Sequence, residues 1–150
     1  MECMEKKMAG IAALIIFITT LVALSAYCVN AVFPKAPPIT CPNPVNSWDK
    51  EKYIFSVRVG HNSNPDVQVK NNEIGLVTQY IPYAQPTRRQ STNDFPEAED
   101  YYTIEIEAAS HTYRYYLYAE GSQMYIEVPY EGVYTIEGKI LDVVAPYFQD

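Results

Sequence analysis

The sequence contains little cysteine, and this shortage bears on how the fold is held together. Three cysteines among 150 residues are too few for a disulfide framework. Cys3 precedes a long apolar run, Cys28 lies near the end of that run, and Cys41 follows it, so only the last two are expected to share a compartment. Three alternatives remain: Cys28 pairs with Cys41, Cys41 links two chains into a dimer, or Cys41 stays free.

Positive charge is also scarce. The chain has 11 lysines and arginines against 18 aspartates and glutamates, and its formal net charge is -7. Residues 1–33 hold two lysines and two glutamates, so the whole net charge belongs to residues 34–150. An acidic domain repels phosphate backbones and anionic lipid headgroups. We therefore expect no nucleic-acid partner, whereas a cationic peptide or a basic protein surface is compatible. The alternative is an acidic surface that only keeps the domain soluble.

The common catalytic motifs are missing as well. The sequence has no G-x-S-x-G, H-E-x-x-H, Walker phosphate loop or dinucleotide-binding fingerprint. His61 and His111 stand apart, each without a cysteine or carboxylate at metal-ligand spacing. A calcium-loop count over residues 62–73 fails because Val67 stands where glycine is required. We expect no enzymatic activity, no cofactor and no metal.

What is present at the N-terminus is a long run without charge, Met8–Val29. About 22 residues form a helix of roughly 33 Å, which is enough to cross a hydrocarbon core of about 30 Å. Lys6 and Lys7 precede the run and favour a cytoplasmic N-terminus, so the rest of the chain is expected outside a cell membrane crossed once. The alternatives are a signal peptide cleaved near residues 29–31 and lipidation of Cys28.

The remaining pattern predicts a spacer followed by a folded α+β domain. We divide the chain into a cytoplasmic tip and transmembrane anchor (1–33), a spacer with five prolines (34–47) and an extracytoplasmic domain (48–150). Runs of strand with helices set apart favour an antiparallel β-sheet with two helices covering one face. The expected strands are 53–59, 67–69, 101–107, 112–119, 123–128 and 133–136; the expected helices are 74–81, capped by Asn71 or Asn72, and 140–148.

One predicted strand is unusually rich in tyrosine. Residues 112–118 read TYRYYLY, and side chains along a strand alternate between the two faces of the sheet. Tyr113, Tyr115 and Leu117 should therefore share one face and enter the core. Arg114 is costly to bury, so Tyr116 and Tyr118 should share a wetter face with it.

The wetter face has two interpretations. It is either an ordinary half-exposed sheet surface with paired charges, or a platform on which a partner docks, because tyrosine and arginine are enriched at interfaces. The residues expected to form the platform are Tyr116, Tyr118, Tyr125, Glu105, Glu107, Glu127 and Arg114.

Two segments carry a resemblance to a known family. They are PTRRQSTNDFPEAEDYYTIEI at Pro86–Ile106 and YLYAEGSQMYIEVPYEGVYTI at Tyr116–Ile136. The chain resembles, over residues 53–148, an uncharacterised family of small extracytoplasmic domains, mainly from Gram-positive bacteria. Its members join an anchor or lipoprotein signal to a "PTxxxSxxDxP" loop and a "YYIExPYxGIY" hairpin. The resemblance implies location and class and no reaction. Matching positions are Pro86, Thr87, Ser91, Asp94, Pro96, Tyr125, Ile126, Glu127, Pro129, Tyr130, Gly132 and Tyr134.

Together these features favour a membrane-tethered extracytoplasmic binding module, immunity-like or sensing, whose partner is a peptide or protein at the cell surface. The alternative is a structural accessory subunit of a membrane complex or a pilin-like assembly. The anchor, the spacer and the acidic domain are compatible with both hypotheses.

Overall fold

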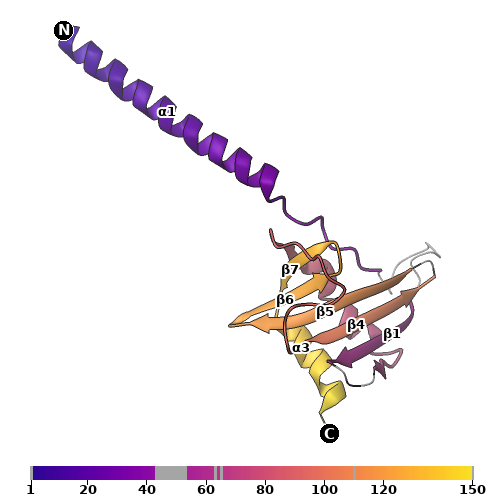
Figure 1. Ribbon diagram of the computed structural model, residues 1–150. Helices are drawn as coiled ribbons and strands as arrows, with labels where there is room; N and C mark the ends of the chain where they lie inside the picture. The colour runs from indigo at the N-terminus through magenta and orange to yellow at the C-terminus, as the bar shows by residue number, and fades with distance from the viewer. Residues whose placement is uncertain (1, 43–53, 63, 65, 110, 150) are drawn as a thin grey trace. The chain divides into compact units, whose positions relative to one another are not determined.

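The computed structural model describes residues 2–42, 54–62, 64, 66–109 and 111–149, and the chain divides into two compact units between Lys35 and Ala36 (Figure 1). The first unit is the helix α1 (Glu2–Val32). Its segment Gly10–Val32 has a mean hydropathy of 2.4 and, among the described residues, is the one helix long and apolar enough to span a membrane. From Met8 onward its large apolar side chains are exposed, as expected for a single helix that packs against no other element of its own unit.

The second unit is built on one antiparallel sheet of seven strands in the order β2-β1-β4-β5-β6-β7-β3. This confirms the predicted α+β class, and the meander β4-β5-β6-β7 follows the chain order (Figure 1). The strands are β1 (Ile54–His61), β2 (Val67–Gln68), β3 (Gln85–Pro86), β4 (Tyr102–Ala108), β5 (Thr112–Glu120), β6 (Gln123–Val128) and β7 (Gly132–Ile136).

Short helices cover one face of this sheet. They are α2 (Ile74–Thr78), η2 (Ile81–Tyr83), α3 (Lys139–Val144) and η3 (Ala145–Phe148). Ile74 and Val77 of α2 and Ile140 and Val144 of α3 are buried in the same cluster as the inward-facing strand residues. Hydrophobic burial of this one face therefore holds the helices and strands together.

Several element boundaries differ from the sequence expectation. The predicted helix over 74–81 ends at Thr78, and a separate 3-10 turn follows because Pro82 lacks the N–H that a continued α-helix needs. Asn71 and Asn72 do not cap α2, whose N-cap is Glu73 without a side-chain cap hydrogen bond. Strand β3 was not expected, because a two-residue pairing leaves no periodicity to detect.

Part of the expected spacer lies against the sheet domain. The backbone N–H of Ala36 donates to the carbonyl of Thr87 at 3.1 Å, and the Tyr115 hydroxyl donates to the Thr40 carbonyl at 2.6 Å. Residues 36–42 thus belong to the folded unit, and residues 43–47 of the spacer lie outside the described residues. An extended proline-rich segment can dock this way because its backbone carbonyls remain free to accept hydrogen bonds.

Candidate functional site

The two faces of the tyrosine-rich strand separate as predicted. Tyr115 and Leu117 are fully buried in the core cluster, and Tyr113 packs against its edge. Arg114, Tyr116 and Tyr118 lie on the opposite face, which we call the outer face. The alternation of side chains was therefore sufficient to assign the core face of β5.

The prediction that the outer face is open is wrong over β5 and β6. Tyr116 is 1% exposed and Tyr118 is 3% exposed, because the loop formed by residues 87–101 lies over them. The rings of Phe95 and Tyr101 contact the ring of Tyr116, with centroids 5.9 and 5.5 Å away. These tilted and edge-on ring contacts exclude water from the ring of Tyr116, while Phe95 itself stays largely exposed. These tyrosines therefore do not form an exposed platform.

Glu127 is also buried beneath this loop, at 6% exposure. The Ser91 hydroxyl donates to its Oε1 at 2.7 Å, and the Tyr118 hydroxyl donates to its Oε2 at 3.0 Å. A buried carboxylate is tolerated when donors satisfy its oxygens. Burial is the main cause that raises the pKa of the Tyr118 hydroxyl, with the nearby Glu127 charge next, so Tyr118 remains a donor.

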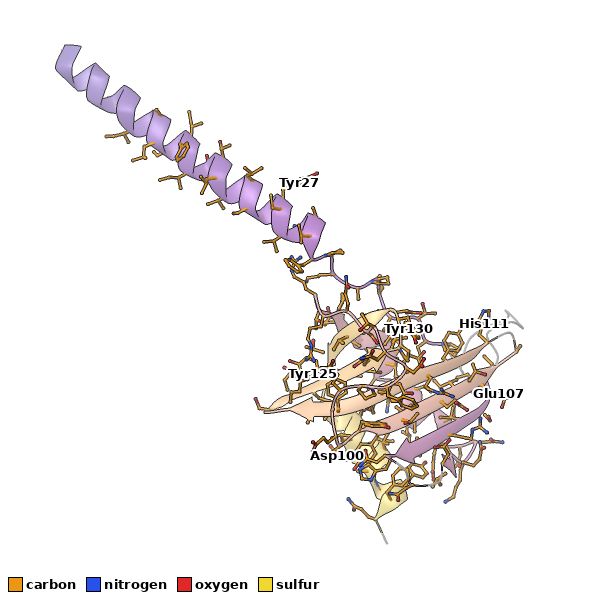
Figure 2. The ribbon with its side chains drawn as sticks, in the orientation of Figure 1. Tyr27, Asp100, Glu107, His111, Tyr125 and Tyr130 are labelled. Carbon is orange, nitrogen blue, oxygen red and sulfur yellow. The ribbon has the colours of Figure 1, made fainter. Side chains whose placement is uncertain are left out.

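Arg89, near the start of the loop, attaches the loop to Glu120 at the end of β5. Its guanidinium forms a bidentate pair with Glu120, at 2.7 and 2.8 Å, and lies 5.0 Å from the centre of the Tyr125 ring. Tyr125, half-buried beneath it, is labelled in Figure 2. The pair with Glu120 raises the pKa of Arg89 and lowers that of Glu120. A cleft of about 740 Å³ between the loop and the sheet is lined by Glu97, Glu99, Asp100, Glu120 and Glu127.

The part of the outer face over β1, β4 and the start of β5 is not covered by this loop. Arg58, Glu105 and Arg114 stand side by side across the three strands. Arg58 donates to Oε1 of Glu105, and Arg114 donates to Oε2 at 2.7 Å. Glu105 is 8% exposed, so its predicted exposure is wrong as well. Glu107 remains exposed and accepts a hydrogen bond from Ser56 at 3.0 Å (Figure 2).

Burial by itself raises the pKa of the Glu105 carboxyl, but hydrogen bonds from Arg114 and Arg58 outweigh it. The pKa of Glu105 therefore lies below its ordinary value of 4.5. The free energy that this charge contributes to folding is present above its ordinary pKa and is lost as the pH falls through the folded pKa. The group of Arg58, Glu105 and Arg114 therefore makes the stability of β1, β4 and β5 decrease at acidic pH.

Replacing Arg114 with methionine should lower the free energy of unfolding at pH 7 by about 1–2 kcal/mol, because Glu105 loses a half-exposed and therefore screened partner. The variant's Glu105 has a higher pKa, so the difference from the native domain should shrink between pH 5 and pH 3. Urea denaturation of residues 34–150 across this range measures the effect. Lys139→Met, at the exposed pair with Glu137, is the control. A difference that stays constant to pH 3 would assign Arg114 to packing alone.

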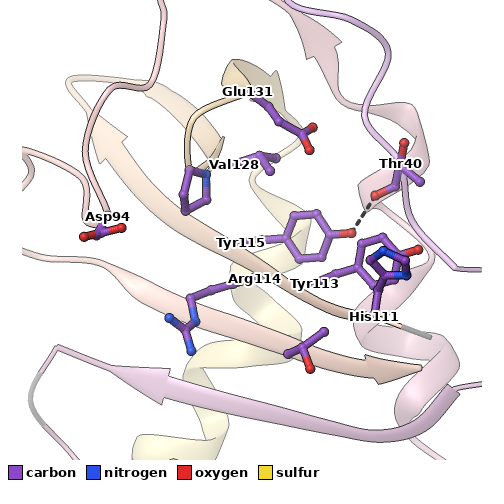
Figure 3. A pocket seen from close by; sticks show the side chains of 10 residues that line it. Thr40, Asp94, His111, Tyr113, Arg114, Tyr115, Val128 and Glu131 are labelled. Atoms are coloured by element: carbon purple, nitrogen blue, oxygen red, sulfur yellow. Dashed lines mark hydrogen bonds between the residues drawn. The ribbon is translucent and has the colours of Figure 1, made fainter. Parts of the chain in front are cut away.

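A groove lies where β5 extends beyond its neighbour β6. It has a volume of about 440 Å³ and is lined by four consecutive β5 residues, 112–115, together with Asp94, Pro129 and Glu131. Figure 3 shows Arg114 and Asp94 on one side of the strand and Tyr115, Thr40 and Glu131 on the other. The groove therefore joins groups from the outer face, the docked segment 36–42 and the turn after β6.

The turn after β6 holds Tyr130 in an unusual conformation. Its φ is +63°, in the left-handed region that non-glycine residues rarely adopt. Its side chain is 65% exposed, yet its hydroxyl donates to Asp94 of the loop at 2.8 Å. Such strain persists where surrounding contacts enforce it, and it concentrates at ligand sites. Tyr130 thus links the two sides of the groove mouth.

Cys41 follows the groove-lining Thr40 in the chain and is a free, partly buried thiol. Burial raises its pKa to about 12, and a hydrogen bond with Tyr115 acts in the opposite direction. Because the thiolate is the reactive form, the local environment does not favour the disulfide-linked dimer, which stays an untested prediction.

We expect Cys41 in folded residues 34–150 to react with iodoacetamide at pH 7 about 1000-fold more slowly than in the urea-unfolded chain, because a pKa near 12 rather than 9.0 leaves that much less thiolate. Mass spectrometry of timed samples measures the rate. A comparable rate in the folded domain, or a disulfide-linked dimer on non-reducing gels, would contradict this assignment.

His61 has a structural role, whereas His111 is exposed and lines the groove. His61 Nε2 lies 2.7 Å from Asp100 Oδ1, a pairing between residues 39 apart that sequence spacing did not reveal. The His61 ring stacks on Tyr102 at a centroid distance of 4.3 Å. His61 is the first cause that lowers the pKa of Asp100. No cluster of three or more histidine, cysteine or carboxylate side chains suited to a metal occurs among the described residues.

Some groove residues were missed at the level of sequence. Asp94 was named only as a matching position of the family's loop motif, and Glu131 and Thr112 were not named as site residues. They come together through the loop crossing and the unequal lengths of β5 and β6, which sequence spacing does not encode. One signal was available: Phe95 and Pro96 are apolar in an otherwise polar loop, which is typical of a loop that packs against its own domain.

Comparisons with known proteins agree with this fold. The NMR structure of a protein from Ruminococcus gnavus is similar, with a TM-score of 0.52 and 28% sequence identity, over 66% of this chain and 98% of that chain. That protein thus adopts the fold with about a third of this chain lacking a counterpart. No curated protein matches. A family model, DUF5301, described as a domain of unknown function (DUF5300), matches residues 47–135, more than half of the chain. The chain therefore belongs to this uncharacterised family, DUF5301.

Proposed function

We propose that this protein is a membrane-tethered binding module that meets a peptide or protein on the extracytoplasmic side, without enzymatic activity. The observation that carries the proposal is the groove of about 440 Å³ beside β5. Aromatic rings, hydroxyls and charges converge there from three separate segments, as in ligand sites that fix orientation with a few polar groups.

The location of the module rests on α1. Its segment Gly10–Val32 has the length and hydropathy of a membrane-spanning helix, and Lys6 and Lys7 precede it in the sequence. Positive charge before the first span favours a cytoplasmic N-terminus. The acidic domain would then lie outside the cell, within reach of surface peptides and proteins.

A labelling experiment tests this topology. A chain carrying Ser122→Cys in the exposed β5–β6 turn, with all native cysteines changed to serine, should react in intact cells with a membrane-impermeant maleimide. A second chain that keeps only the native Cys3 should react only after lysis. The reverse pattern, or shielding of position 122 until lysis, would overturn the proposed topology.

The binding role is tested by site-specific photo-crosslinking in cells. A benzophenone amino acid replaces Thr112 at the groove, or Lys139 on α3 as the control; both residues are exposed. We expect a defined adduct from position 112 and none from position 139, and the purified adduct partner should bind the isolated domain. Adducts of equal yield from both positions, or none, would contradict the proposal. A stable complex retained through α1 alone would favour the structural-subunit alternative.

A further inference from the structure

Strand β5 has one side without a partner along part of its length. All of Thr112–Leu117 pairs with β4, whereas pairing with β6 begins only at Tyr116. The chain leaves the β6 position at Pro129, which cannot donate to a ladder. Among the described residues, no backbone hydrogen bond outside the sheet ladder reaches residues 112–115 on that side. A short open edge therefore exists within the sheet, in addition to its two outer edges at β2 and β3.

The groove lies along this edge rather than over a face. Successive strand residues point to opposite faces, so a pocket above the sheet would be lined by alternate residues only. This groove is lined by four consecutive ones, including Tyr113 from the core side and Arg114 from the outer side. Its space therefore continues the plane of the sheet, at the position that a longer β6 would fill.

The charges beside the edge are mainly negative. Asp94 and Glu131 line the groove. Arg114 is the one lysine or arginine among the groove-lining residues, and Glu105 already accepts a hydrogen bond from it. The formal charge of residues 34–150 is -7, which steers cations toward the domain from a distance.

Resting on the proposed function, we infer that the groove binds an extended, lysine- or arginine-bearing peptide segment of another protein, which adds to the sheet as a short strand beside residues 112–115. Backbone hydrogen bonds to the open edge supply sequence-independent affinity, and alternate side chains supply specificity. Asp94 and Glu131 lie on opposite sides of β5 (Figure 3). Side chains on both faces of the added peptide would therefore meet a carboxylate.

Two hydrogen bonds fix the groups on either side of this open edge. Tyr130, held at a positive φ, donates to Asp94 and so positions that carboxylate at the groove mouth. The Tyr115 hydroxyl holds the Thr40 carbonyl at the opposite rim. An edge flanked on both rims by fixed groups admits one extended chain and resists pairing with a second sheet, which is how proteins limit edge aggregation.

The test uses residues 34–150 labelled with ¹⁵N, which include the whole compact unit Ala36–Asp150. The similar protein from Ruminococcus gnavus, over 98% of its own chain, adopts this fold and matches 66% of the present chain. The probes are an acetylated and amidated octapeptide of alternating threonine and lysine, its counterpart with glutamate for lysine, and the lysine peptide with alternate backbone amides methylated. We expect the lysine peptide to shift the amide signals of residues 112–115 and to slow the hydrogen exchange of those facing the groove. It should bind at least about tenfold more tightly than the other two peptides.

Substitution of single carboxylates tests which negative charges contribute to peptide binding. Glu131→Gln and Asp94→Asn should each weaken binding of the lysine peptide by about three- to fivefold, whereas Asp142→Asn, at an exposed position of α3, should leave it unchanged. Equal binding of all three peptides, or shifts confined to the cleft beside Glu97 and Glu120, would overturn strand addition. Amides of 112–115 that all resist exchange in the free domain would also overturn it, because the edge would then be covered by the chain itself. None of these results affects the crosslinking test, whose failure alone would remove the binding function.

Discussion

Truncating Tyr116 to alanine should destabilise the domain as severely as truncating Tyr115, by about 3–5 kcal/mol each. Tyr115 and Tyr116 are both 1% exposed although they lie on opposite faces of β5. Removing either ring leaves a cavity, one in the helix-covered core and one beneath the loop formed by residues 87–101. The loss corresponds to a fall in melting temperature of more than roughly 10 °C for a domain of this size.

Thermal and urea unfolding of residues 34–150 measure this effect. Tyr83→Ala is the matched control, because its side chain is 78% exposed and its truncation should change stability by no more than about 0.5 kcal/mol. If Tyr116→Ala behaved like Tyr83→Ala, the loop would not cover the outer face in solution, and the tyrosine platform expected from the sequence would be restored.

Replacing Glu127 with leucine should cost about 2–4 kcal/mol, for a different reason. The hydroxyls of Ser91 and Tyr118 donate to this carboxylate inside the protein. Without it, two buried donors lose their acceptor, at about 1–3 kcal/mol each, less what the apolar side chain regains by burial. The loop should also become more sensitive to proteolysis, because Ser91 is one of its attachments.

A compensating variant makes this prediction sharp. Adding Ser91→Ala and Tyr118→Phe to Glu127→Leu removes the orphaned hydroxyls, so about half or more of the lost stability should return. Glu107→Leu, on the same outer face of the sheet but exposed, should change the free energy of unfolding by about 0.5 kcal/mol or less. A triple variant no more stable than Glu127→Leu would show that the carboxylate acts outside this hydrogen-bond group.

Both predictions bear on the candidate site. A partner can reach Tyr116, Tyr118 or Glu127 only if the loop leaves the sheet, and the contacts of Arg89, Ser91 and Phe95 oppose that movement. Arg114 is the predicted site residue that both remains exposed and lines the groove. The accessible site therefore lies at the edge of β5 and not on its outer face.

The sequence by itself determined the apolar helix, the antiparallel sheet and the division of β5 into two faces. Each of these follows from a local pattern: an uncharged run, short strands joined by turns, and a period of two that sorts Tyr115 from Tyr116. The family resemblance placed residues 53–148 in an uncharacterised family, and the family match over residues 47–135 supports that assignment.

Only the tertiary structure decided which parts of the sheet faces are exposed to solvent and where β5 has an open edge. Alternation assigns a side chain to a face, but solvent exposure depends on what packs there, and here a loop dominated by polar residues covers the outer face through Phe95, Ser91 and Arg89. The burial of Glu105 depends on its register with two arginines on neighbouring strands. The groove exists because β5 has nine residues and β6 has six, and hydrogen-bond pairing between strands makes that difference an open edge.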